Sequence, residues 1–211
     1  MDFLPPEINQ YAEAHTTPES ALLKRIHLET YQAVHMPRML SGHLQGRFLS
    51  MVSKMVRPRT VLEIGTYTGY SALCLAEGLS PEGKLITLDI NEELEGRVRN
   101  YFKESEYHSR LNFRIGDALT ILPMLPGPFD LVWIDADKEN YSRYYDLVID
   151  KVPSGAFILA DNVLWSGKVL ETKPDKDTRA IQAFNDKVQA DSRIENILLP
   201  LRDGIMMMRK I

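Results

Sequence analysis

The chain has 211 residues, of which 44% are hydrophobic and 26% charged, and its formal net charge is −4. This composition is typical of a globular protein and argues against a disordered chain, and no apolar run approaches the roughly 18 residues of a membrane span. The net charge gives no global basic bias toward nucleic acid, and the length favours one domain over residues 1–211. A single cysteine, Cys74, and a start without a signal-peptide pattern predict a cytoplasmic protein with no membrane partner.

The N-terminal part of the chain is predicted to be an arm followed by helices. Residues 1–18 form the arm, which ends at the Thr16-Thr17-Pro18 punctuation. Apolar residues at helical spacing predict one helix over Glu19 to Val34 and a second over about Gly42 to Val56. We therefore divide the domain into the arm (1–18), the N-terminal helices (19–57) and a core (58–211).

Strand and helix patterns alternate after Pro58. The predicted strands are Thr60 to Ile64, Lys84 to Leu88, Leu111 to Ile115, Phe129 to Ile134, Ala156 to Ala160, Ile194 to Pro200 and Ile205 to Lys210. The predicted helices are Tyr70 to Leu79, Glu92 to Glu106, Ala118 to Met124, Tyr141 to Lys151 and Thr178 to Ala190. This alternation predicts an α/β fold with a mostly parallel sheet and helices on both faces, and the last two strands add an antiparallel edge.

Two buried strands end abruptly in carboxylates. Asp135-Ala136-Asp137-Lys138 follows one strand, and Asp161-Asn162 follows the next. Ligands of open α/β sheets bind outside the carboxyl ends of the strands, so these side chains are expected to converge. Their oxygens suit Mg²⁺, with Ca²⁺ or Mn²⁺ as alternatives. The competing interpretation is that Asp161 and Asn162 only form a turn or cap after the strand.

A glycine turn joins the first strand to its helix. Gly65 and Gly69 permit close approach of a ligand, but the spacing is not the G-x-G-x-x-G pattern of dinucleotide sites. Glu63 places an acid beside this turn, which favours a ligand with positive charge and no phosphate. A nicotinamide dehydrogenase is therefore disfavoured.

Two further strand ends complete a predicted nucleoside site. Asp89 ends the second strand, where an acid commonly accepts hydrogen bonds from ribose hydroxyls, and the backbone of Gly116-Asp117-Ala118 could touch an adenine. S-adenosylmethionine has a ribose, an adenine and a sulfonium cation but no phosphate, and so fits these features. The alternative for the glycine turn is a tight strand-to-helix connection without a ligand.

From roughly Met39 to its C-terminus the chain resembles a bacterial-like member of the cation-dependent class I O-methyltransferases of the caffeoyl-CoA and catechol type. Three motifs carry the resemblance: Val61-Leu62-Glu63-Ile64-Gly65-Thr66-Tyr67-Thr68-Gly69-Tyr70-Ser71, Trp133-Ile134-Asp135-Ala136-Asp137-Lys138 and Asp161-Asn162-Val163-Leu164-Trp165-Ser166-Gly167. The resemblance implies a Rossmann-like seven-stranded sheet in the order 3-2-1-4-5-7-6 with the last strand antiparallel, and a homodimer.

The resemblance also implies roles for individual residues. Asp135, Asp161 and Asn162 match the metal ligands, and Lys138 matches the general base. Trp165 matches an aromatic wall of the substrate pocket, where Asp137 is also placed. The positions that match methyl-donor contacts are Met39, Ser41, Glu63, Gly65, Ser71, Asp89, Ala118 and Asp135. Lys138 has an alternative as a solvated charge paired with Glu139 or Asp137.

The expected function is metal-dependent transfer of a methyl group from S-adenosylmethionine to a hydroxyl of a catechol-like or ortho-dihydroxy aromatic small molecule. One alternative keeps the chemistry but methylates 5-hydroxyuridine in tRNA, against which the acidic net charge argues weakly. A second is a binding module without catalysis. His27, His35 and His43 lie eight positions apart but lack accompanying acids at ligand spacing, so packing or surface roles are favoured.

Overall fold

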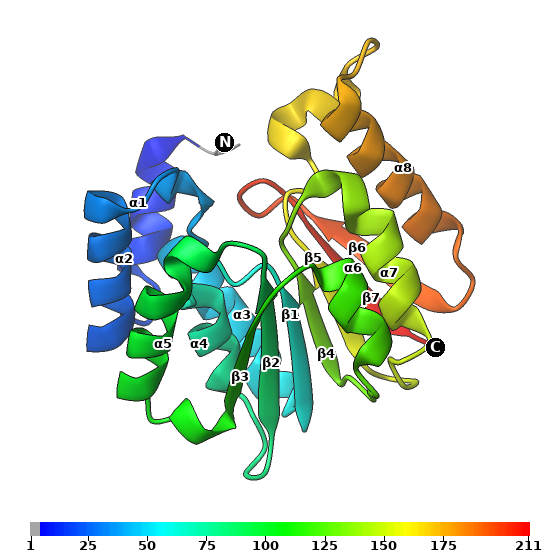
Figure 1. Ribbon diagram of the computed structural model, residues 1–211. Coiled ribbons are helices and arrows are strands. Elements are labelled where there is room, and N and C mark those ends of the chain that lie inside the picture. The colour runs from blue at the N-terminus through cyan, green and yellow to red at the C-terminus, as the bar shows by residue number, and fades with distance from the viewer. Residues whose placement is uncertain (1–4) are drawn as a thin grey trace.

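The computed structural model describes residues 5–211 and contains one seven-stranded sheet in the order β3-β2-β1-β4-β5-β7-β6 (Figure 1). The strands are β1 (Thr60–Ile64), β2 (Lys84–Asp89), β3 (Leu111–Ile115), β4 (Leu131–Ile134), β5 (Phe157–Ala160), β6 (Ile194–Leu199) and β7 (Ile205–Lys210). Only β7 runs antiparallel to its neighbours, and it lies between β5 and β6. The predicted fold class and strand order are confirmed.

Eight α-helices surround this sheet within residues 5–211. They are α1 (Pro6–Ala14), α2 (Ala21–Ala33), α3 (Gly42–Val56), α4 (Tyr70–Ala76), α5 (Glu95–Glu104), α6 (Ala118–Ile121), α7 (Tyr141–Ile149) and α8 (Lys176–Ala190). The predicted arm contains α1. Its first four residues lie outside the described residues, so the prediction that the chain starts without a signal peptide is not tested there.

The element boundaries depart from the sequence prediction by a few residues. The strand expected from Phe129 begins only at Leu131, and the carboxylate of the preceding Asp130 accepts hydrogen bonds from the backbone N–H groups of Arg59 and Thr60. The helix expected over Glu92 to Glu106 is a 3₁₀ turn, Glu92–Leu94, followed by α5. Such shifts at helix and strand ends leave the topology unchanged.

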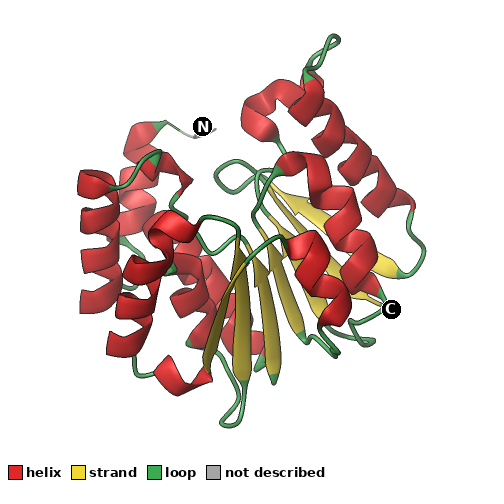
Figure 2. Cartoon of the chain, viewed as in Figure 1, coloured by secondary structure: helices red, strands yellow, loops and turns green. Residues whose placement is uncertain are grey.

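Helices cover both faces of the sheet (Figure 2). Two apolar clusters hold these helices against the strands. Side chains of a strand alternate between faces, so neighbouring residues of β1 and β4 enter different clusters. Leu62, Ile64, Val132 and Ile134 pack with residues of α6, α7 and α8. Val61, Leu131 and Trp133 pack with residues of α2 to α5. Helices therefore pack on both faces of the sheet, as the predicted alternation of strands and helices requires.

The strand order reverses at β1, which pairs in parallel with both β2 and β4. The chain segments that leave the ends of β1 and β4 therefore lead to helices on opposite faces of the sheet. The space between these segments is where an open α/β sheet holds its ligand. Both predicted half-sites begin here: the glycine turn follows Ile64, and the acids follow Ile134.

No helix among residues 5–211 combines the length and the apolar character needed to cross a membrane.

Phe184 on α8 should be a principal stabilising residue of the apolar cluster that supports the acidic strand ends. It is fully buried and packs edge-to-face on Tyr141 and Tyr145 of α7. We expect Phe184→Ala to lower the free energy of unfolding by about 3–5 kcal/mol, since the cavity cannot be refilled by rigid neighbours. Denaturant unfolding measures this. The control is Ile197→Ala on β6, which is 53% exposed and should cost within about 1 kcal/mol; equal losses would contradict the assignment.

Candidate active site

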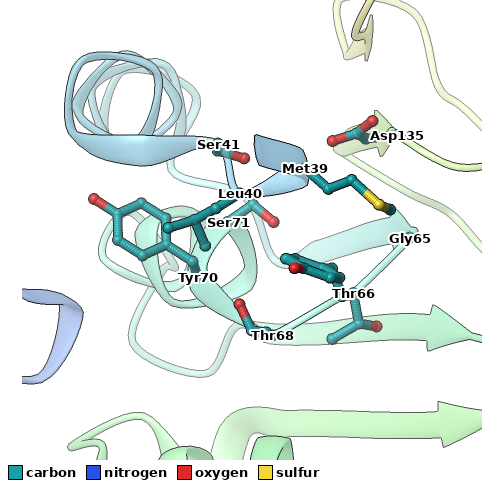
Figure 3. Close-up of a pocket in the computed structure, with 10 residues that line it drawn as sticks. Met39, Leu40, Ser41, Gly65, Thr66, Thr68, Tyr70, Ser71 and Asp135 are labelled. Carbon is teal, nitrogen blue, oxygen red and sulfur yellow. The ribbon is translucent and has the colours of Figure 1, made fainter. Parts of the chain in front are cut away.

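A pocket opens at the reversal of strand order, between the glycine turn, the end of β4 and the segment before α3 (Figure 3). It brings together five of the eight predicted donor contacts, namely Met39, Ser41, Gly65, Ser71 and Asp135. Leu40, Thr66, Tyr67, Thr68 and Tyr70 complete its lining. The segment before α3, the turn that follows β1, the start of α4 and the residue that follows β4 thus line one pocket, although they lie far apart in the sequence.

Gly65 is the point of closest approach between the two half-sites. A Cβ atom added there would lie 1.9 Å from the carbonyl oxygen of Asp135, so no side chain fits. Its φ of +103° is also a conformation that favours glycine. Backbone hydrogen bonds fix the contact: Gly65 N–H donates to Leu88 O over 2.9 Å, and Asp135 N–H donates to Ile64 O over 2.8 Å. The glycine predicted for ligand approach also allows the two strand ends to meet.

Glu63 lies beneath the pocket rather than in its lining. Its carboxyl accepts hydrogen bonds from the hydroxyls of Ser71 and Thr87, both over 2.5 Å. Complete burial raises the pKa of Glu63 to about 8, and the hydroxyl groups offset this only in part. Burial therefore favours the protonated form of this carboxyl, and the Glu63 side chain is not exposed to the pocket. The sequence could not indicate this burial.

Asp89 and Ala118 are not part of the pocket lining. The Asp89 carboxylate accepts hydrogen bonds from Tyr67 N–H over 2.6 Å and from Asn91 N–H over 2.8 Å, which ties it to the glycine turn. Ala118 begins α6, whose N-cap is Asp117. Their predicted roles at ribose and adenine remain predictions.

The Lys138 ammonium group lies among the polar strand ends. Its Nζ donates to Asn162 Oδ1 and to the Tyr141 hydroxyl, both over 2.7 Å, and lies 3.3 Å from Asp135 Oδ1. The side chain is only 10% exposed. The alternative of a solvated surface charge does not fit this position, because Glu139 pairs with Lys176 instead. A largely enclosed ammonium group thus contacts two of the predicted cation ligands, Asp135 and Asn162.

Asp161 is buried and does not cap a turn with its carboxylate. Oδ2 accepts a hydrogen bond from Gln45 Nε2 over 2.8 Å, and Oδ1 is buried with no hydrogen-bond partner among the described residues. Burial, together with the nearby Asp135 carboxylate, raises the pKa of Asp161 above its ordinary value. A buried acceptor without a partner is costly unless a ligand completes it. This observation argues against the alternative of a turn residue.

The turn between β6 and β7 holds the loop that follows Asp161. The Asp203 carboxylate accepts from Ser166 N–H and, over 3.5 Å, from Asn162 Nδ2. Asn162, Trp165 and Ser166 all have positive φ values, which for residues other than glycine cost backbone energy. This strained loop places the Trp165 ring centroid 5.7 Å from Lys138 Nζ. Trp165 therefore lies beside Lys138, while its role as a wall of the substrate pocket stays a prediction.

Asp137 and the histidines do not extend this cluster. The Asp137 carboxylate accepts hydrogen bonds from Asn140 Nδ2 and the Tyr144 hydroxyl, which fix it locally. His43 hydrogen-bonds to Thr17 O over 2.7 Å, and His27 lies 3.5 Å from Glu19. Within residues 5–211, no group of three or more His, Cys, Asp or Glu side chains is arranged to hold a metal ion. The predicted cation ligands are not such a group, because they combine the carboxylates of Asp135 and Asp161 with the amide of Asn162.

Comparison with known proteins identifies the family. The family model described as O-methyltransferase matches residues 12–211. The chain belongs to the O-methyltransferase family. This confirms the predicted resemblance and the predicted enzyme class, an S-adenosylmethionine-dependent O-methyltransferase of the caffeoyl-CoA and catechol type.

Relatives and solved structures agree with this assignment. Catechol O-methyltransferase domain-containing protein 1 of Mus musculus is 31% identical, covering 99% of this chain and 82% of that protein. Caffeoyl-CoA O-methyltransferase 1 of Eucalyptus globulus is 36% identical, covering 79% of this chain and 73% of that protein. The structure of the O-methyltransferase from Bacillus cereus in complex with SAH has a TM-score of 0.90 at 29% identity, with 97% of each chain covered.

Sequence analysis missed three polar residues of this O-methyltransferase site: Gln45, Arg202 and Asp203. Gln45 shares a helical face with Leu49 and Val52, which are buried in α3. A polar residue at an apolar position of a helix is a signal that could have indicated it. Arg202 and Asp203 carry no such signal, because a charged turn between two strands is ordinary.

Glu63 should make the stability of this O-methyltransferase depend on pH. Its pKa is about 8 in the folded chain against 4.5 as the ordinary value. Between pH 4.5 and about 8 the folded state binds more protons than the unfolded state. The contribution of Glu63 to the free energy of unfolding is therefore complete below pH 4.5 and is lost as the pH rises through about 8. We expect the wild type to lose on the order of a few kcal/mol across this range relative to Glu63→Gln.

Denaturant unfolding of both proteins across that pH range measures the difference. Glu195→Gln on β6 is the matched control, because that side chain is 67% exposed and should leave the pH dependence unchanged. Parallel curves for wild type and Glu63→Gln would contradict the assignment.

Proposed function

We propose that this O-methyltransferase transfers the methyl group of S-adenosylmethionine to a hydroxyl of a catechol-like or other ortho-dihydroxy aromatic small molecule, and that a divalent cation takes part. The observation that carries the proposal is the convergence of Asp135, Lys138 and Asn162 beside a pocket formed by the glycine turn. A nucleophile bound at these polar groups would face a donor bound along the turn.

The residues present fit a cation. Asp161 Oδ1 is buried without a partner, and the Lys138 ammonium already lies near Asp135 Oδ1 and Asn162 Oδ1. Two carboxylates and an amide oxygen are hard ligands that suit Mg²⁺, while Ca²⁺ and Mn²⁺ share this preference. Asp135, Asp161 and Asn162 would hold the ion, which when bound would orient two neighbouring acceptor oxygens and lower the pKa of the reacting hydroxyl.

The donor side follows from the pocket. Met39, Ser41, Gly65, Ser71 and Asp135 would contact the amino-acid part of S-adenosylmethionine, with Asp89 and Ala118 toward the nucleoside. In the reaction the acceptor oxygen forms a bond to the methyl carbon, the bond from that carbon to sulfur breaks, and the electron pair returns to sulfur. Lys138 would act as the base in its free-amine form, whose nitrogen lone pair accepts the hydroxyl proton to give the ammonium, since its Nζ lies at the acceptor side of the pocket. Orientation of the two reactants would supply much of the acceleration.

Labelled S-adenosylmethionine offered with a panel of catechols and Mg²⁺ tests the proposal. We expect methylated catechol with Mg²⁺ and its loss when a chelator is added, with recovery on addition of excess Mg²⁺. Methyl transfer that continues unchanged in the presence of the chelator would contradict the cation-dependent mechanism. A hydroxyuridine-containing tRNA belongs in the same panel, because its methylation in place of the catechols would favour the nucleic-acid alternative. The homodimeric state and the cytoplasmic location stay predictions.

Asp161→Asn separates the acceptor half of the site from the donor half. The change keeps the shape of the side chain but removes the charge that would attract the cation. We expect Mn²⁺ affinity, measured by titration calorimetry, to fall about 100-fold, while affinity for S-adenosylhomocysteine stays close to that of the wild type. Loss of S-adenosylhomocysteine binding together with a lowered melting temperature would instead indicate a structural role for Asp161.

A further inference from the structure

Gln45 links the β6–β7 turn to Asp161. Its side chain is fully buried on α3, and both ends of its amide are used. Nε2 donates to Asp161 Oδ2 over 2.8 Å, and Oε1 accepts from Arg202 Nη1 over 2.5 Å. Arg202 is thus linked to Asp161 through a single side chain, although Arg202 lies in the β6–β7 turn and Asp161 follows β5.

Arg202 also holds the segment that lines the donor pocket. The same guanidinium nitrogen donates to the carbonyl oxygen of Leu40 over 3.1 Å and to that of Ser41. Leu40 and Ser41 are both part of the pocket lining. One cation therefore contacts the donor segment directly and the acceptor side through Gln45.

The chemistry of these groups fixes the direction of the chain of hydrogen bonds. A guanidinium group can only donate, so the amide oxygen of Gln45 must face Arg202 and the amide NH₂ must face Asp161. The NH₂ group engages Oδ2 and leaves Oδ1 buried and unpartnered among the described residues. Exchange of the two amide ends would place NH₂ against the guanidinium and an oxygen against a carboxylate.

We propose that Arg202 and Gln45 are positioning residues: through Gln45, Arg202 orients the Asp161 carboxylate so that Oδ1 faces the cation, and Arg202 directly fixes residues 39–41 against the donor. This inference rests on the cation-dependent function proposed above. Hydrogen-bond partners that orient a metal ligand typically change metal affinity 10–100-fold.

Two variants divide the roles of this pair. Gln45→Met keeps the volume of the side chain but removes the hydrogen bond to Asp161, while Arg202 keeps both carbonyl contacts. We expect Mn²⁺ affinity to fall about 10–100-fold and affinity for S-adenosylhomocysteine to stay unchanged. Arg202→Met removes all three contacts, so we expect the same loss for Mn²⁺ and in addition about a tenfold loss for S-adenosylhomocysteine.

Ser53→Ala on the same helix is the matched control. Ser53 is buried and donates to Leu75 O over 2.6 Å, so its loss removes one buried hydrogen bond away from the site. Titration calorimetry with Mn²⁺ and with S-adenosylhomocysteine is run on the full chain, and melting temperatures are recorded for each variant. Ser53→Ala should lower the melting temperature without changing either affinity.

The outcomes separate this inference from the proposed function. A wild type that binds no Mn²⁺ would refute the cation-dependent function itself. A wild type that binds Mn²⁺, with Gln45→Met equal to it, would overturn the positioning role alone. Equal losses of both ligands in Gln45→Met would also overturn it, because the variant would then act through the general structure of α3.

Discussion

The contact between Gly65 and the backbone of Asp135 is the constraint on which the rest of the site depends. Parallel pairing of β1 with β4 places Ile64 opposite Ile134, so the residues that follow them emerge side by side. The missing side chain at Gly65 lets the two chain segments touch at the carbonyl oxygen of Asp135. A donor bound along the glycine turn and an acceptor bound at Asp135 would therefore be neighbours without any movement of the strands.

The acceptor side depends on a second element, the turn that joins β6 to β7. Arg202 acts through Gln45 on Asp161, and its neighbour Asp203 holds Asn162 and the strained loop after it. Two adjacent residues of one turn thus act on two predicted cation ligands: Arg202 on Asp161 through Gln45, and Asp203 on Asn162 directly. Insertion of β7 between β5 and β6 brings this turn to the end of β5. The antiparallel strand of the fold has a direct consequence for the geometry of the site.

The carboxylates at the site lie close to two basic side chains of the same chain. Asp135 and Asp161 lie close enough that the first raises the pKa of the second, and Lys138 and Arg202 oppose this effect. Isolated carboxylates would be costly at this depth, so the two cations stabilise the ligand-free chain. The same arrangement leaves the acidic groups ready for a cationic ligand. Glu63, with no basic partner among its hydrogen bonds, responds to burial by favouring its protonated form.

The sequence alone determined the architecture and indicated the segments that meet at the site, because their signals are local. Apolar runs, glycine spacing and acids at strand ends reflect rules that act over a few residues, and Val61 to Ser71 or Trp133 to Lys138 contain such a signal within one segment. The strand order also followed, once the motifs indicated the family.

Only the tertiary structure decided which side chains meet across the sheet. Gln45, Asp161 and Arg202 come from α3, the end of β5 and the β6–β7 turn, and a residue pattern cannot encode a contact between elements so far apart. The protonation of Glu63 and the location of Lys138 among three polar groups were likewise decided by burial. Solvent exclusion and hydrogen-bond geometry are properties of the packed chain, so they appear only when the elements have come together.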